Sequence, residues 1–136
     1  MYENWQLRRW ETPMSDAKHL FMESLHDHSG LLEIILADYL ENVAVARYKV
    51  TFCRYPAYRN IDESYRLELG QRLRELNDPN ATGWTFTVPD SEWIGEFDNE
   101  PILEVFNPGV VHYLIMTESD VIEVLDNEPP VLEILG

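Results

Sequence analysis

Apolar and polar residues alternate with a period of two over residues 43–52. The odd positions include Arg47, Lys49 and Thr51. The even positions are apolar: Ala44, Ala46, Tyr48, Val50 and Phe52. Neighbouring side chains of a strand point to opposite faces, so the pattern predicts a strand with one face in the core and one basic face in water.

The segment before this strand is also strand-like. Residues 31–39 are apolar and rich in β-branched side chains, and Glu41-Asn42 separates them from the alternating segment. Two strand-forming runs joined by a short polar turn are typical of a β-hairpin.

Two segments have helical spacing instead. Residues 15–28 begin at a capping residue, Ser15 or Asp16, and end at Ser29-Gly30, so we expect a first helix there. Its predicted face consists of Leu20, Phe21, Ser24 and Leu25.

The second predicted helix covers residues 61–76. Asn60 is in the capping position, Glu63 completes a capping box, and Asn77-Asp78-Pro79 ends the helix. Its apolar stripe is Ile61, Tyr65, Leu69, Leu73 and Leu76.

The second half of the chain predicts more strands, over residues 84–88, 110–117, 121–125 and 131–135, with a hairpin turn at residues 118–120. A short amphipathic turn is expected around Trp93, Ile94 and Phe97. We therefore predict an α+β fold: a mainly antiparallel sheet of about five to six strands with two helices packed on it. Residues 1–136 are expected to form one domain, with residues 1–14 as a loosely ordered N-terminal segment.

One short sequence occurs twice. Asp98-Asn99-Glu100-Pro101 and Asp126-Asn127-Glu128-Pro129 each precede an apolar run. A true repeat unit is usually longer and more frequent, so we interpret both copies as an acidic turn, a proline and an edge strand.

Charge is distributed unevenly along the chain. Arg74 is the last basic residue: residues 75–136 contain 14 Asp or Glu, whereas residues 1–74 carry 11 acids against 10 bases. The net charge of −15 is therefore −1 in the first part and −14 in the second. Such a chain repels phosphate, so we expect no nucleic-acid partner, although Arg54, Tyr55, Tyr58 and Arg59 form a basic-aromatic cluster. We expect these arginines to pair with the acidic half.

Composition also limits the function classes. The chain has one cysteine, Cys53, and no apolar segment long enough for a signal peptide or a membrane span. We expect a cytoplasmic protein without a membrane partner.

No catalytic or cofactor-binding motif is present. The sequence contains no G-x-S-x-G, no P-loop and no G-x-G-x-x-G. Cys53 reads as an inert, partly buried strand cysteine, and His112 as a hydrogen-bonded core histidine. We expect no cofactor and no enzymatic activity.

A metal site is the alternative. His19, Glu23 and His26 are spaced i, i+4, i+7, so on a helix they share one face, and His28 is near. These four residues could belong to a small metal-binding protein or a metal-dependent enzyme.

The second half resembles a known group of proteins. The residues that carry the resemblance are Ser91-Glu92-Trp93-Ile94, the run from His112 to Leu125, Pro129-Pro130, and Arg59-Asn60-x-Asp62-Glu63. In these the chain is similar to small bacterial single-domain proteins of the toxin-immunity type. The resemblance implies a bacterial, cytoplasmic protein with a protein partner, and it supplies no catalytic residues.

These observations favour a non-enzymatic acidic binding protein, immunity- or inhibitor-like, that acts on a basic protein such as a toxin or nuclease. Its oligomeric state stays open. The residues that we expect to contact the partner are Glu92, Trp93, Glu96, Asp98, Glu100, Glu104, Glu118 and Asp120.

Overall fold

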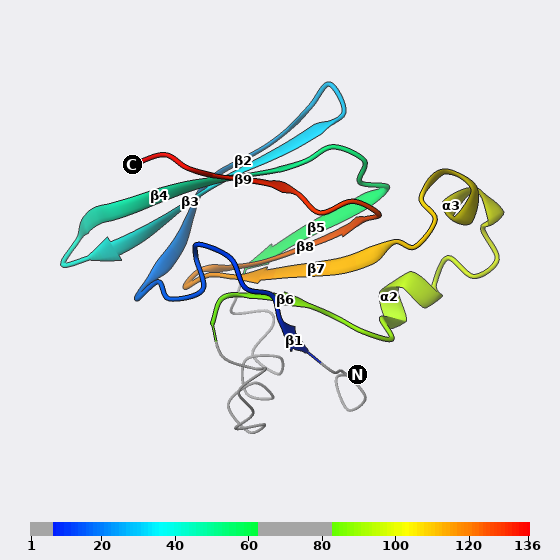
Figure 1. Ribbon diagram of the computed structural model, residues 1–136, viewed down its shortest axis with the longest axis horizontal. Helices are drawn as coiled ribbons and strands as arrows, with labels where there is room; N and C mark the ends of the chain where they lie inside the picture. The colour runs from blue at the N-terminus through cyan, green and yellow to red at the C-terminus, as the bar shows by residue number, and fades with distance from the viewer. Residues whose placement is uncertain (1–6, 63–82) are drawn as a thin grey trace.

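The computed structural model describes residues 7–62 and 83–136, which form two antiparallel sheets (Figure 1). The four-stranded sheet has the order β2 (Leu20–His28), β3 (Leu31–Leu40), β4 (Val43–Phe52) and β9 (Val131–Ile134). The five-stranded sheet has the order β1 (Arg8–Arg9), β6 (Thr85–Thr87), β7 (Val111–Met116), β8 (Asp120–Asp126) and β5 (Ala57–Asp62). Two short helices, α2 (Glu92–Gly95) and α3 (Pro101–Phe106), connect β6 to β7.

The main core lies between the two sheets. Tyr48, Val50 and Phe52 of β4 are buried together with Tyr113 of β7, and the rings of Phe52 and Tyr113 are 5.5 Å apart. The even-numbered face of β4 is therefore the core face, as its alternation predicts.

Both predicted hairpin turns are confirmed. Glu41 and Asn42 join β3 to β4 with φ of 52° and 66°, the left-handed conformations that a two-residue hairpin turn requires. Residues 117–119 join β7 to β8, where the Thr117 amide donates to the Asp120 carbonyl oxygen over 2.8 Å.

The prediction of one sheet with two packed helices was wrong in part. The described strands divide between two sheets, and β9 pairs with β4 of the four-stranded sheet and not with β8. The described helices have only four and six residues, and α3 buries a single side chain, Leu103.

The helix predicted over residues 15–28 is wrong: residues 20–28 form strand β2. A β-bulge between Met22 and Ser24 shifts the pairing register with β3. Leu20 and Met22 are even-numbered and lie before the bulge, and Leu25 is odd-numbered and lies after it. All three pack in the core. The bulge therefore explains why the apolar residues do not alternate strictly and resemble a helical face.

The predicted helix over residues 61–76 is wrong at its start. Asn60 lies opposite Ile122 in the β5–β8 ladder and does not cap a helix, and Ile61 and Asp62 continue the strand. Residues 63–76 lie outside the described residues.

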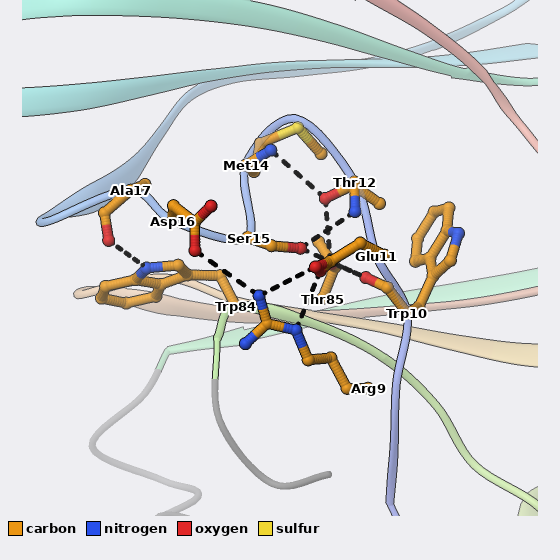
Figure 2. Close-up of polar contacts among 10 residues, drawn as sticks. All are labelled: Arg9, Trp10, Glu11, Thr12, Met14, Ser15, Asp16, Ala17, Trp84 and Thr85. Atoms are coloured by element: carbon orange, nitrogen blue, oxygen red, sulfur yellow. Dashed lines mark hydrogen bonds and ion pairs between the residues drawn. The ribbon is translucent and has the colours of Figure 1, made fainter. Parts of the chain in front are cut away.

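The N-terminal segment is part of the fold from Leu7 onward, contrary to our expectation of a loose segment over residues 1–14. Met14 is fully buried. Residues 10–17 form a turn fixed to β6: Thr85 Oγ1 donates to the Trp10 carbonyl over 2.6 Å, and Trp84 Nε1 donates to the Ala17 carbonyl over 2.8 Å (Figure 2). Residues 1–6 lie outside the described residues.

The repeated acidic tetrapeptide precedes two different elements. Residues after Asp126-Asn127-Glu128-Pro129 form the edge strand β9, as predicted. Residues after the first copy form helix α3, with Pro101 in the first turn, where a missing amide hydrogen costs nothing.

Candidate functional site: the acidic end around helix α3

The acidic residues that the sequence nominates lie at two different places. Strand β7 leads away from α3, and β8 returns toward it, so Glu118 and Asp120 are at the far end of the sheet from both helices (Figure 1). Seven residues of β8 correspond to about 20 Å. The turn at residues 118–120 therefore does not converge with the carboxylates of the helices.

Glu118 and Asp120 also have local partners. Glu118 Oε1 is 3.1 Å from His19 Nδ1, and Asp120 accepts a hydrogen bond from Ser119 Oγ over 2.9 Å. We therefore remove both residues from the candidate site.

The other carboxylates gather on and between the helices. Five exposed side chains belong to this group, and none of them has a Lys, Arg or His within ion-pair distance in the described part of the chain. By contrast, the carboxylates of Glu23, Glu33 and Glu123 each have a cationic partner. The unpaired group is Glu92, Glu96, Asp98, Glu100 and Glu104.

Helix α3 adds an apolar surface that sequence analysis missed. Ile102, Val105 and Phe106 are 66%, 70% and 69% exposed. Only Leu103 of α3 is buried and fixes the helix to the protein. We call Ile102, Val105 and Phe106, together with the five unpaired carboxylates of the segment 92–104, the α3 surface. The sequence contains a signal for this surface. A helix of the run Pro-Ile-Leu-Glu-Val-Phe that buries only one narrow face must expose several apolar side chains.

Hydrogen bonds hold the loop after α3 against two neighbouring loops. Asn107 Nδ2 donates to the Arg54 carbonyl over 2.7 Å and to Asn127 Oδ1 over 3.1 Å. Arg54 in turn is 3.5 Å from Glu128. The acidic loop at residues 126–128 therefore lies beside the loop that follows α3.

Helix α2 is held by a buried polar chain. Ser91 Oγ caps the helix by accepting from the Ile94 amide over 3.2 Å, and it lies 2.7 Å from His112 Nδ1. His112 Nε2 lies 2.9 Å from Glu123 Oε1, and Arg59 makes two hydrogen bonds to the Glu123 carboxylate. His112 and Glu123 are fully buried.

Ser91, His112 and Glu123 are the residue types of a serine–histidine–acid triad. Ser91 and His112 also line a cavity of about 450 Å³. Two features favour a structural role. Arg59 neutralises Glu123 in a bidentate pair, and the Ser91 oxygen is already the acceptor for the helix cap. The network joins α2 to β7, β8 and β5, and it confirms the prediction of a hydrogen-bonded core histidine at position 112.

Trp93 packs against this network, unlike the exposed side chains of Ile102, Val105 and Phe106. Its ring packs edge-on against His112, with centroids 5.2 Å apart, and the Arg59 guanidinium lies 4.2 Å from its centroid. The half-buried ring therefore supports α2, and its contact with a partner stays a prediction.

Of the proposed metal residues, Glu23, His26 and His28 lie on strand β2 and His19 lies directly before it, so their predicted common helix face does not exist. Glu23 accepts from Arg47 over 2.8 Å and from the Tyr39 hydroxyl over 2.7 Å, and His28 is 3.1 Å from Glu33. His19 is bound to Glu118, and His26 packs edge-on against His28. Within residues 7–62 and 83–136, no three His, Cys, Asp or Glu side chains are grouped so that they could hold a metal ion.

The basic-aromatic cluster is divided among internal partners. Arg54 pairs with Glu128 and Arg59 with Glu123, so the expected pairing with the acidic half is confirmed. Burial, and then a hydrogen bond to Asp27, raise the pKa of Tyr55 to about 12. Cys53 is exposed just after β4, not partly buried as predicted.

The chain matches no protein-family model, and it has no significant match among curated proteins or solved structures. No helix in the described part of the chain is long and apolar enough to cross a bilayer.

Proposed function

We propose that this protein is a non-enzymatic binding module that uses the α3 surface to hold a basic protein, in the manner of an immunity protein or inhibitor. The observation that carries the proposal is the coincidence of three exposed apolar side chains with five carboxylates that lack a cationic partner in the described chain.

The two parts of the α3 surface have different tasks. Unpaired carboxylates attract a positively charged partner and speed its association. Ile102, Val105 and Phe106 supply the apolar area that is desolvated in the complex and slows dissociation. A nuclease or toxin that binds nucleic acid has a basic surface of the required sign.

Site-specific photocrosslinking tests the proposal. A benzoylphenylalanine at position 106 should crosslink to a basic protein in cells of the source organism, and mass spectrometry identifies the adduct. The same probe at Val43, which is also exposed (62%) but lies at the tip of the β3–β4 hairpin, is the matched control.

Binding to the purified partner then separates the two contributions. The double variant Glu100→Gln/Glu104→Gln should lower the association rate and the salt dependence, and Phe106→Ser should raise the dissociation rate about tenfold or more. Glu118→Gln should change neither rate. Crosslinking that is equal at positions 43 and 106, or adducts with acidic proteins only, would contradict the proposal.

A further inference from the structure

A second surface, unrelated to α3, lies on the edge strand β9. Among the described residues β9 pairs only with β4, so one side of the strand has no strand beside it. Three apolar side chains of this edge are exposed: Val131 (52%), Ile134 (67%) and Leu135 (49%).

The backbone groups that face outward can be assigned. The Leu135 amide donates to the Arg47 carbonyl, so residue 135 faces β4 with its hydrogen-bonding groups. Because these groups alternate along an antiparallel strand, residues 131 and 133 also bond toward β4. The amides and carbonyls of Leu132 and Ile134 therefore point away from the sheet.

The other sheet edges carry features that prevent pairing with another strand. β1 has only two residues, both arginine. β5 carries Arg59, Asn60 and Asp62.

β2 is protected in two ways: it contains a β-bulge and ends in His-Asp-His. β9 has neither a bulge nor a proline, and its one charged residue, Glu133, lies opposite Lys49 in the register. β9 is thus the unprotected edge among the described strands.

The charge near β9 opposes a second copy of this chain less than the charge of the α3 surface does. The protein as a whole is strongly acidic, with a net charge of −15. Near β9, Arg47 and Lys49 are paired with Glu23 and Glu33, and Glu133 lies opposite Lys49, so these five groups sum to −1. An acidic second molecule is therefore repelled less here than at the α3 surface with its five carboxylates.

We propose that β9 is a self-association edge: two copies pair their β9 strands antiparallel about a two-fold axis and join their four-stranded sheets into one of eight strands. An antiparallel pair of identical strands is self-complementary, because each strand offers the groups of Leu132 and Ile134 to the other. Val131, Ile134 and Leu135 then each pack against a cross-strand side chain of the other copy, which lowers their exposure.

Sedimentation velocity of the full chain, from low micromolar to several hundred micromolar, tests this inference. We expect a monomer–dimer equilibrium. The dimer should become stronger as salt rises, because salt screens the repulsion between two molecules of the same charge. Binding through the α3 surface should weaken with salt, so failure of one proposal is distinguishable from failure of the other.

Two substitutions at one position locate the contact. Ile134→Pro removes an outward amide hydrogen without removing a bond to β4, and Ile134→Lys places a charge on the edge. Each should weaken dimerisation at least tenfold, while far-UV circular dichroism shows the fold retained. Val45→Lys, exposed (54%) on β4 but not on the free edge, is the matched control and should dimerise like the parent.

A parent protein that remains monomeric at every concentration overturns the inference. So does a dimer that both Ile134 variants leave intact, since its contact must then lie elsewhere. A dimer that weakens as salt rises also contradicts it.

Discussion

At the scale of single residues, Glu123 is a fully buried carboxylate between His112 and Arg59. Removing one member of a buried charged pair leaves the other without compensation. The cost is larger than for a solvent-exposed pair, where water replaces the lost partner.

We predict that Glu123→Gln lowers the free energy of unfolding by about 3 kcal/mol. Arg59 would then have a neutral amide oxygen at position 123 as its acceptor in place of a carboxylate. Urea unfolding measures the loss. Glu118→Gln, which removes the exposed pair with His19, should cost less than about 1 kcal/mol. An equal loss of unfolding free energy in the two variants would contradict the prediction that the buried carboxylate of Glu123 stabilises the fold more than the exposed one of Glu118.

A second residue-scale prediction concerns acid stability. Hydrogen bonds from Arg47, and then from Tyr39, hold the pKa of Glu23 below its ordinary value of 4.5. Because the folded pKa is the lower one, this pairing stabilises the protein fully above the ordinary value and is lost as pH falls through the folded pKa. The free energy of unfolding should therefore decrease on acidification from about pH 5 downward.

Glu23→Gln should flatten this decrease, because the amide cannot titrate. Urea unfolding at a series of pH values from 7 to about 3 measures the slope. Glu96→Gln, an exposed carboxylate without an ion pair in the described chain, should keep the parent slope. An unchanged slope in Glu23→Gln would contradict the prediction.

Residue types alone identified His112 as a core histidine but not its partners. Ser91 is 21 positions and Glu123 is 11 positions away in the chain. Only the packing of α2 on the sheet and the β7–β8 register bring the three together. Sequence spacing gives no signal for contacts of this kind.

At the scale of elements, strict alternation was a dependable guide and capping signals were not. β4 and the two hairpin turns follow directly from local pattern and turn chemistry. Ser15 has the chemistry of a helix cap, yet its hydroxyl accepts from the Thr12 amide in a turn. A short polar residue satisfies a free amide in many local structures, so the cap signal alone does not define a helix.

The two acidic tetrapeptides show the same limit more clearly. The apolar residues after each copy are similar, but one run becomes α3 and the other becomes β9. β9 forms backbone hydrogen bonds to the edge of β4. The described α3 residues form their backbone hydrogen bonds within their own turn and loop. Tertiary hydrogen bonding overrides the local preference of such short segments.

At the scale of the whole molecule, one core joins the two sheets. Phe52 from the four-stranded sheet is fully buried and packs against Tyr113 from the five-stranded sheet. Because the same side chains stabilise both sheets, we expect the sheets to unfold together.

Phe52→Ala should lower the free energy of unfolding by about 3–5 kcal/mol through loss of apolar burial and formation of a cavity. Far-UV circular dichroism follows both sheets, and tryptophan fluorescence, to which Trp10 beside β1 and Trp84 beside β6 contribute, follows the five-stranded sheet. Both signals should shift to the same lower midpoint. Val43→Ala, an exposed change on the same strand, should leave the midpoint within experimental error. Separate midpoints would contradict a shared core.

The sequence by itself determined the strands with clear alternation, the hairpin turns, the concentration of acid after Arg74 and the absence of known catalytic motifs, because each of these is a property of neighbouring residues. Tertiary structure decided the rest. It divided the strands between two sheets, separated Glu118 and Asp120 from the helices, packed Trp93 against His112 and exposed α3 and the β9 edge. The physical reason is that the exposure of a side chain and its charge partner depend on contacts between segments that are distant in the sequence. Patterns of neighbouring residues do not specify those contacts.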